Sequence, residues 1–252
     1  MDKQVKVVGV AFSPRHGNTE IQVREALRAA EEIPGVKTEY YSIVGKILNP
    51  CDSCYRCFQN PDPSRPCPAY DDPEDCFNEI ANLILGADGI IFGSPVYYMS
   101  VTAQMKAFID RTMGIEAFGW PLRNKVAGFL TVAFDRNGGQ ENCIQDMVKW
   151  AMMQDMLCVS VGPERPAGAS IGGYLGAMAM QGFPMPLSSS KPEGSQGIRQ
   201  DEQGMQATRQ VGWRVAEMAK VIKAGFQGLE KEDTRWPRGA VTVDMLEAFK
   251  NS

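Results

Sequence analysis

Hydrophobic residues in this chain gather in short runs that are rich in β-branched side chains. The clearest run is VKVVGVAF at residues 5–12, and GIIFG at residues 89–93 has the same character. Runs of this kind are typical of strands that are buried on both faces of a parallel sheet. Together with an alternating segment and two later apolar runs, they predict five strands, at residues 5–12, 37–42, 89–93, 125–134 and 157–161.

Between the predicted strands, hydrophobic residues recur with the three- to four-residue spacing of amphipathic helices. In residues 101–113, for example, four hydrophobic side chains fall on one face. An acidic segment with a proline at 71–74 is typical of a helix start. The pattern predicts five helices. The first extends from the end of a polar loop at 13–19 to about residue 32, and the others lie at 77–85, 101–113, 141–153 and 202–224.

Strands that alternate with helices predict an α/β fold, in which helices cover both faces of a doubly wound parallel sheet. Right-handed crossovers leave few strand orders, and of these we favour the five-stranded, flavodoxin-like order 2-1-3-4-5. The chain of 252 residues is long enough for one such domain, which we place at 1–225, followed by a polar tail at 226–252. Two segments interrupt the pattern. One is a cysteine-rich loop at 43–75, and the other is a Gly-, Pro- and Ser-rich loop at 162–201 with a short helical piece around 175–180.

In this strand order a binding crevice lies beyond the carboxyl ends of the first and third strands. Polar, glycine-bearing segments follow the first, third and fourth predicted strands, at 13–19, 93–99 and 135–140. Because the carboxyl ends of parallel strands meet at one edge of the sheet, we expect these three segments to form one binding site.

The net charge of the chain and the lengths of its apolar runs argue against two classes of binding partner, nucleic acids and membranes. The net charge of -4 argues against a nucleic-acid partner, since counterion release needs a basic surface. The longest clean apolar runs, such as 126–134, are far shorter than a membrane span, and the N-terminus lacks the order of a signal peptide. We therefore expect a cytoplasmic protein without a membrane partner, in which thiols stay reduced.

The first polar segment, SPRHGNT at 13–19, joins a strand to a helix. Backbone N–H groups at a helix start, with hydroxyl and amide side chains, can bind a phosphate group. The segment has neither the Walker sequence nor the G-x-G-x-x-G dinucleotide fingerprint. The alternative is a simple helix cap, with Asn18 or Thr19 as the capping residue.

The second segment carries the most specific motif of the chain. Residues 93–111 read GSPVYYMSVTAQMKAFIDR, which closely resembles a signature of the NAD(P)H-dependent FMN reductases, a family that includes the iron–sulfur flavoproteins. Two further matches are NGGQE at 137–141 and DEQGM at 201–205. The alternatives are that the tyrosine pair packs in the core or against a subunit neighbour, and that the glycine pair makes a simple turn. The resemblance covers most of residues 5–225.

The resemblance implies two groups of FMN contacts. The phosphate would be bound by Ser13, Arg15, Gly17, Asn18 and Thr19. The isoalloxazine ring would lie near Pro95, Val96, Tyr97, Tyr98, Met99, Asn137, Gly138 and Gly139. Asp135 and Arg136 differ from the small or polar residues that the family has beside the ring.

Four of the seven cysteines lie within seventeen residues. They form the motif C-x2-C-x2-C, which is followed by a gap of nine residues and then by Cys67-Pro68. Disulfides are disfavoured among reduced thiols, and structural zinc usually uses two separated pairs. Three thiolates at this spacing can bind one face of a cubane, and a fourth can complete it. The alternative is a loop without metal, whose thiols are remnants or redox-active.

One branch of the family has a compact cysteine motif after its second strand, and its members are iron–sulfur flavoproteins. This resemblance implies a [4Fe–4S] cluster bound by Cys51, Cys54, Cys57 and Cys67, although the gap before Cys67 is longer than the branch usually has. Cys76 is a rival fourth ligand. Cys143 and Cys158 are expected to be small apolar fillers, and His16, the one histidine, has a role in the phosphate loop or none.

The resemblance implies electron transfer, in which NAD(P)H is the transient reductant and a small molecule or protein is the acceptor. The cofactors carry such chemistry, so we name no catalytic acid or base. A cluster-free FMN or quinone reductase and a non-enzymatic carrier or redox sensor are the alternatives. The resemblance also implies a homodimer or homotetramer, with the cysteine loop or the loop at 162–201 near a neighbour's flavin.

Overall fold

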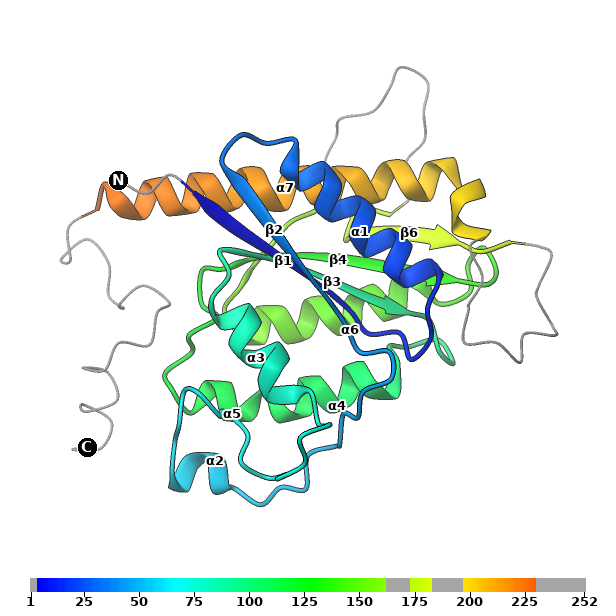
Figure 1. Cartoon of the computed structure of the whole chain (residues 1–252). Coiled ribbons are helices and arrows are strands. Elements are labelled where there is room, and N and C mark those ends of the chain that lie inside the picture. The colour runs from blue at the N-terminus through cyan, green and yellow to red at the C-terminus, as the bar shows by residue number, and fades with distance from the viewer. Residues whose placement is uncertain (1–3, 162–172, 183–196, 230–252) are drawn as a thin grey trace.

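The computed structural model describes residues 4–161, 173–182 and 197–229. Its strands form one parallel sheet in the order β2-β1-β3-β4-β5, with β6 also paired to β4, which confirms the predicted order (Figure 1). The strands are β1 (Val5–Ala11), β2 (Val36–Ser42), β3 (Gly89–Pro95), β4 (Val126–Ala133), β5 (Leu157–Cys158) and β6 (Ala177–Met180).

The helices alternate with these strands along the chain. Those predicted from the spacing of hydrophobic residues are present, and two short helices, α2 in the cysteine loop and α5 after α4, were not predicted. The helices are α1 (Asn18–Glu31), α2 (Arg56–Gln59), α3 (Phe77–Leu85), α4 (Ala103–Arg111), α5 (Met113–Glu116), α6 (Gln140–Met153), the short 3-10 helix η1 (Gly197–Gln200) and α7 (Glu202–Gln227).

The fifth position of the sheet differs from the prediction. Only Leu157–Cys158 of the expected strand pairs with β4, opposite Val126 and Ala127. The expected helical piece around 175–180 is instead the strand β6, which pairs with Leu130 to Ala133 at the other end of β4. One long strand is therefore flanked by two short strands in succession. The backbone of β6 pairs with that of β4 because the end of β4 has no other neighbour on this side.

The acidic segment at 71–74 lies in a turn, and the helix that follows it spans Phe77–Leu85, as predicted. Asp72 accepts a hydrogen bond from the Glu74 N–H at 2.9 Å, and the helix begins only after Cys76. Most of the loop at 162–201 and the tail beyond residue 229 lie outside the described residues. The assignment of 1–225 to a single domain stays a prediction.

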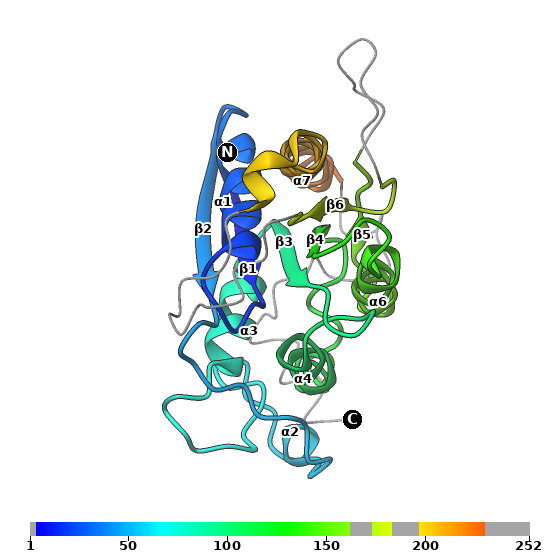
Figure 2. The same ribbon diagram turned by 90° about the vertical axis from the view of Figure 1, so that its right-hand side faces the viewer.

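Helices cover both faces of the sheet. Figure 2 shows α1 and α7 on one face and α3, α4 and α6 on the other. Val5 and Val7 of β1 pack toward α1 and α7. Phe92 and Phe129 of β3 and β4 pack toward α4 and α6, where Trp150 meets Phe92 edge-on. The sheet is thus buried on both faces, as its continuous apolar runs predict, and polar chemistry is left to its edges.

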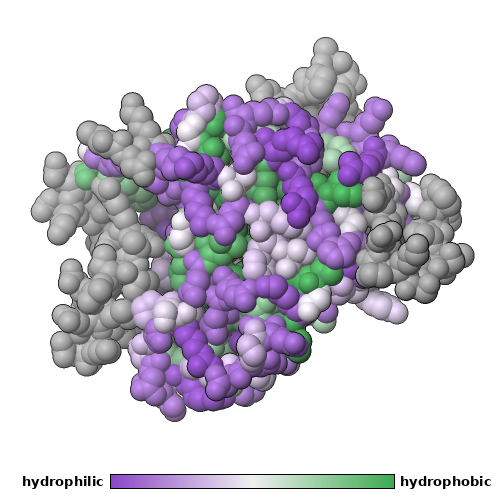
Figure 3. Space-filling model, in the orientation of Figure 1, coloured by the Kyte–Doolittle hydropathy of each residue, from purple (hydrophilic) through white to green (hydrophobic). Residues whose placement is uncertain are grey.

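The face drawn in Figure 3 is mostly hydrophilic, with hydrophobic residues in separate small patches. No helix within the described ranges is both long enough and apolar enough to cross a bilayer.

Candidate functional site

The three polar segments lie at the carboxyl edge of the sheet, which faces the viewer in Figure 2. We call them loop 1 (residues 13–19, after β1), loop 2 (residues 95–102, after β3) and loop 3 (residues 134–139, after β4). Each connects a buried strand to a helix, so its position is fixed by elements on both sides.

The backbone of loop 1 is shaped by Ser13. The Ser13 hydroxyl donates to the Arg15 carbonyl at 2.7 Å and accepts from the Arg15 N–H at 3.2 Å. Gly17 then occupies the N-cap position directly before α1, and it has no side chain to cap the helix. The expected alternative of a cap by Asn18 or Thr19 is therefore wrong. Among the described residues, no side chain accepts from the first N–H groups of α1, and that end of a helix attracts anions.

The other side chains of loop 1 divide between solvent and structure. Arg15 is exposed, whereas Thr19 is buried. The Asn18 side chain has partners at both ends, because its amide nitrogen donates to Gln181 at 3.0 Å and its oxygen accepts from the Ile198 N–H at 3.2 Å. The Asn18 side chain thus holds β6 and η1 against loop 1, and its backbone N–H is the group left for a phosphate.

His16 contacts a carboxylate in the first turn of α1. Its Nδ1 lies 2.9 Å from Glu20, and the same carboxylate accepts hydrogen bonds from Tyr40 and Ser42. Burial would raise the pKa of Glu20, but the hydrogen bonds from Ser42, His16 and Tyr40 outweigh it and the pKa lies below its ordinary value. Glu20 therefore stays anionic near the start of α1, with three donors around it.

Loop 2 places its tyrosine pair in solvent. Tyr97 and Ser100 exchange two backbone hydrogen bonds of 3.0 Å around Tyr98 and Met99, whose φ angles are 45° and 69°. Two successive left-handed residues cost conformational energy when neither is glycine. Tyr98 is 103% exposed, so the alternative that this pair packs in the core is wrong. The turn presents aromatic and thioether surface at the edge of the sheet.

Hydrogen bonds connect loop 2 to Phe12, the residue directly before loop 1. The Thr102 hydroxyl, fully buried, donates to the Phe12 carbonyl at the end of β1 at 2.9 Å and caps α4 by accepting from Met105. The Thr102 N–H in turn donates to the Ser94 hydroxyl at 3.1 Å. Sequence reasoning did not single out Thr102, although a threonine just before a helix is a capping signal.

Close packing connects loop 3 to loop 2. A Cβ atom on Gly139 would lie 2.7 Å from the Met99 Cα and 3.1 Å from a Val96 methyl group, and the Gly139 φ is 102°. Only glycine tolerates both conditions. Asp135, Arg136 and Asn137 in loop 3 are exposed. The three loops thus form one continuous rim, as the sequence predicts.

A small polar cavity of about 140 Å³ adjoins loop 3 and extends to the start of α7. It is lined in part by Arg136, Gln140, Met180 and Asp201. The side-chain oxygen of Gln140 is buried there without a partner among the described residues. The cavity was not predicted, because β6, which forms one wall, was expected to be helical. The matched segment at 201–205 also lines it.

The four cysteines of the predicted cluster line one cavity, which is separate from the three loops. Cys51, Cys54, Cys57 and Cys67 meet there beneath α4 and α5, together with Arg111 and Gly114. Burial, together with the nearby Cys67 and Cys54 thiols, raises the pKa of Cys57. The rival ligand Cys76 lies directly before α3 and does not line this cavity, and burial raises its pKa to about 11.

This cavity has the donor chemistry of a cluster site but little space. Its volume is about 10 Å³, and in the described part of the chain no three His, Cys, Asp or Glu side chains are arranged to hold a metal ion. Two guanidinium groups point at the thiols, since Arg111 Nε lies 3.2 Å from Cys67 Sγ and Arg56 Nε lies 3.3 Å from Cys54 Sγ. Four thiols and two cationic donors suit an anionic cluster, provided that the thiols move outward to admit it.

The two remaining cysteines differ from each other. Cys143 is fully buried against Thr131, as expected of an apolar filler, and burial raises its pKa to about 11. Cys158 is exposed, so the same expectation is wrong for it. It lies at the end of β5, where the sheet is uncovered because the strand is only two residues long.

Comparisons with known proteins agree with this geometry. Residues 5–162 match the family of NADPH-dependent FMN reductases. An iron-sulfur flavoprotein of Methanocaldococcus jannaschii is 38% identical over 220 residues, which cover 87% of this chain and all of the relative (100%). An iron-sulfur flavoprotein of Archaeoglobus fulgidus is 31% identical over 218 residues, or 86% of this chain and 98% of the relative. The solved structure of a flavodoxin, WrbA-like protein from Agrobacterium tumefaciens has a TM-score of 0.54 at 22% identity, covers 86% of this chain and 99% of its own, and supports the fold alone.

Proposed function

The chain belongs to the family of NADPH-dependent FMN reductases, and from this premise we propose that it is an FMN-binding flavoprotein oxidoreductase. The observation that carries the proposal is the continuous rim of loops 1, 2 and 3 at the carboxyl edge of a parallel sheet. That edge is where ligands bind in this architecture. The names of the relatives, iron-sulfur flavoproteins, agree with a flavin ligand.

Loop 1 would bind the FMN phosphate. The uncapped N-terminus of α1 offers the N–H groups of Asn18 and Thr19, and the exposed Arg15 can add a charged donor. Ser13 contributes by fixing the turn, because its hydroxyl is occupied by the backbone of Arg15. A singly charged side chain and several N–H groups match a phosphate monoester better than an uncharged ligand.

Loops 2 and 3 would bind the isoalloxazine ring. The side chains of the 97–99 turn lie exposed, and Gly139 allows the backbone of loop 3 to pack directly on that turn. Asn137, Gly138 and Gly139 precede α6, whose N-terminus also lacks a side-chain cap. N–H groups at such an end can donate to the ring's carbonyl oxygens, while the aromatic faces cover its apolar part.

The cysteine cavity would bind a [4Fe–4S] cluster through Cys51, Cys54, Cys57 and Cys67. In support, these four thiols line one cavity, Cys76 lies outside it, and two guanidinium groups donate to the thiols. Bound at these residues, FMN would supply hydride chemistry with NAD(P)H as the reductant, and the cluster would supply one-electron transfer. A cluster-free reductase stays the alternative, because the cavity must widen before it can hold iron.

We further propose a homodimer or homotetramer in which the cysteine loop, or the loop at 162–201, approaches a neighbour's flavin. The exposed Tyr98 and Met99 leave apolar surface beside the ring that a second copy would cover. Light scattering of the purified protein would test this, since a monomer at micromolar concentration contradicts it.

Anaerobic purification, followed by an absorption spectrum and by assays for iron and sulfide, tests the cofactor content. We expect flavin bands with about four iron and four sulfide per chain. Flavin without iron would support the cluster-free reductase, and zinc in place of iron would make the cysteine site structural. Steady-state oxidation of NADH and NADPH with flavin, quinone or dye acceptors separates an enzyme from a carrier, because a carrier would show no turnover. The acceptor that turns over fastest would indicate whether the physiological acceptor is a small molecule or a protein.

A further inference from the structure

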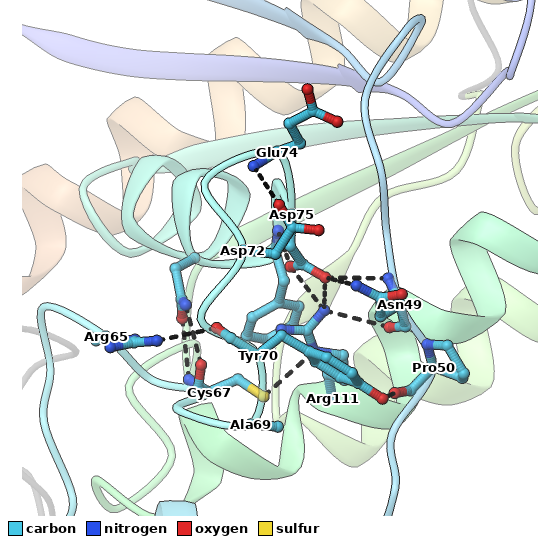
Figure 4. Close-up of polar contacts among 12 residues, drawn as sticks. Asn49, Pro50, Arg65, Cys67, Ala69, Tyr70, Asp72, Glu74, Asp75 and Arg111 are labelled. Carbon is cyan, nitrogen blue, oxygen red and sulfur yellow. Dashed lines mark hydrogen bonds and ion pairs between the residues drawn. The ribbon is translucent and has the colours of Figure 1, made fainter.

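Arg111 is the largest fully buried side chain among the described residues, and it lies outside the three flavin loops. It is the last residue of α4. Its Nη1 donates to both carboxylate oxygens of Asp75, at 2.7 and 2.8 Å, and to the Asn49 carbonyl at 3.2 Å (Figure 4). Its Nε donates to Cys67 Sγ at 3.2 Å. Arg111 therefore joins the cysteine loop to the helix that leads from loop 2.

The position of this guanidinium is fixed from several sides. It lies 4.4 Å from the ring centroid of Phe77 and 5.0 Å from that of Tyr70. One turn further along the chain, a Cβ atom on Gly114 would lie 2.2 Å from the Pro66 carbonyl oxygen, so the cysteine loop is in direct backbone contact with the start of α5. Arg111 cannot move away from Cys67 without displacing this packing.

One nitrogen of Arg111 has no partner. Its Nη2 is buried and makes no hydrogen bond within the described part of the chain, and Arg111 lines the cavity of the four cysteines. An unpaired N–H on a buried cation is costly, so an acceptor is expected in this direction. Asp75 supplies one negative charge for the guanidinium, whereas four thiolates around iron and sulfide would supply more. A cluster bound by these cysteines would supply the missing acceptor once the thiols have moved outward to admit it.

We propose that Arg111 is a positioning residue for the cluster, which holds Cys67 toward the iron and stabilises the reduced state. This inference rests on the proposed function, because it requires that the cluster is present. Reduction adds one electron to the cluster, and dithionite supplies that electron in the test below. The added negative charge develops beside a buried cation in a low-dielectric environment, so the cation raises the reduction potential.

Arg56 provides a matched control on the other side of the cavity. Its Nε lies 3.3 Å from Cys54 Sγ, nearly the same distance as in the Arg111 contact. Its side chain is 48% exposed, whereas that of Arg111 is 0% exposed. Water and salt screen an exposed charge, so the same substitution should change the potential much less at Arg56.

The test is a redox titration of the cluster, followed by electron paramagnetic resonance, in the wild type and in three variants. Arg111→Gln removes both the buried charge and the donor to Cys67, and Arg56→Gln is its control. Arg111→Lys keeps the charge but loses the donor to Cys67, and it is the second Arg111 variant if Arg111→Gln fails to fold. The FMN potential, followed by absorbance, is measured in the same samples.

Arg111→Gln should lower the cluster's reduction equilibrium constant at least tenfold, or about 59 mV for one electron. Arg111→Lys should lower it less, because only the hydrogen bond to Cys67 is lost. Arg56→Gln should change it less than twofold, and the FMN potential should stay constant in all variants. Fully loaded Arg111 variants with the wild-type cluster potential would overturn the inference while leaving the proposed function intact. Wild-type protein without iron and sulfide would overturn the inference and the proposed cluster, whereas bound FMN in the same sample would still support a cluster-free flavin oxidoreductase.

Discussion

At the scale of single residues, backbone conformation distinguishes the candidate flavin site as much as side-chain chemistry does. Tyr98, Met99 and Asn137 have positive φ angles, although none of them is glycine. Such conformations cost energy and persist where the surrounding structure enforces them. Here two contacts enforce them. Thr102 of loop 2 donates a hydrogen bond to Phe12, directly before loop 1, and Gly139 of loop 3 packs against Met99 of loop 2. The rim is therefore preorganised, and this reduces the entropy lost when a ligand binds.

Gly139→Ala should weaken FMN binding at least tenfold. The new methyl group would overlap the backbone of Met99 and separate loops 2 and 3. Gly45→Ala is the control, since Gly45 also has a positive φ, of 75°, but no atom lies within 4 Å of its Cβ position. Both variants share the backbone strain, so a difference in FMN affinity, measured by fluorescence titration, isolates the contact between the loops. Equal affinities in the two variants would show that this contact does not shape the site.

Cys67→Ser should abolish stoichiometric iron binding, whereas Cys76→Ser should retain it. Cys67 lines the cavity with the other three cysteines, while Cys76 precedes α3 and does not line it. Iron and sulfide per chain, measured after anaerobic purification, check this, and FMN content shows that each variant is folded. If Cys76→Ser loses iron and Cys67→Ser keeps it, the assignment of the fourth ligand is wrong.

At the scale of elements, the sequence predicts the strands that have long apolar runs, and it does not predict the short strand β6. The strands β1, β3 and β4 were predicted within two residues at each end because their apolar runs are buried on both faces. The strand β6 was missed, since four residues of Ala and Met suit a helix equally well and only the vacant end of β4 selects a strand.

The candidate site divides in the same way. Loop positions follow from strand ends, so loops 1, 2 and 3 were placed correctly on the sheet. Contacts between distant segments cannot be read from local pattern. The hydrogen bonds of Asn18 to Gln181 and Ile198 span more than 160 residues of sequence. Arg111, at the end of α4, pairs with Asp75, which lies before α3. Whether the predicted residues bind FMN or iron stays a prediction.

The opposite, amino edge of the sheet makes a prediction about pH. Lys125 precedes β4, and its Nζ donates to the carbonyls of Leu85 and Ala87 at 2.8 and 2.6 Å. Burial lowers the pKa of Lys125 from its ordinary value of 10.5 to about 8. Between these two pH values the unfolded chain keeps a proton that the native chain has released. Raising the pH through this window therefore stabilises the native state.

Urea unfolding of the wild type and of Lys125→Met, from pH 7 to pH 10.5, measures this effect. The free energy of unfolding of the wild type should rise relative to the variant by up to about 3 kcal/mol across the window. Other groups that titrate in this range, such as the buried thiols, are present in both proteins and cancel in the difference. A difference that is independent of pH would contradict the lowered pKa.

At the scale of the whole molecule, one helix connects two candidate sites. Loop 2 enters α4 at Ala103, and α4 ends at Arg111 on the cysteine cavity. Nine helical residues span about 13 Å, so the sites share no residues but are rigidly linked. The electron path that we propose therefore depends on a fixed scaffold, and the flavin site is its starting point.

The central claim is that loops 1, 2 and 3 bind FMN through its phosphate. The most direct test is a calorimetric titration of flavin-free protein with FMN and, separately, with riboflavin, which has the same ring but no phosphate. We predict saturable binding of about one FMN per chain, with riboflavin bound at least a hundredfold more weakly because the start of α1 and Arg15 have no anion to hold. No saturable binding of FMN, or equal affinity for the two flavins, would contradict the account.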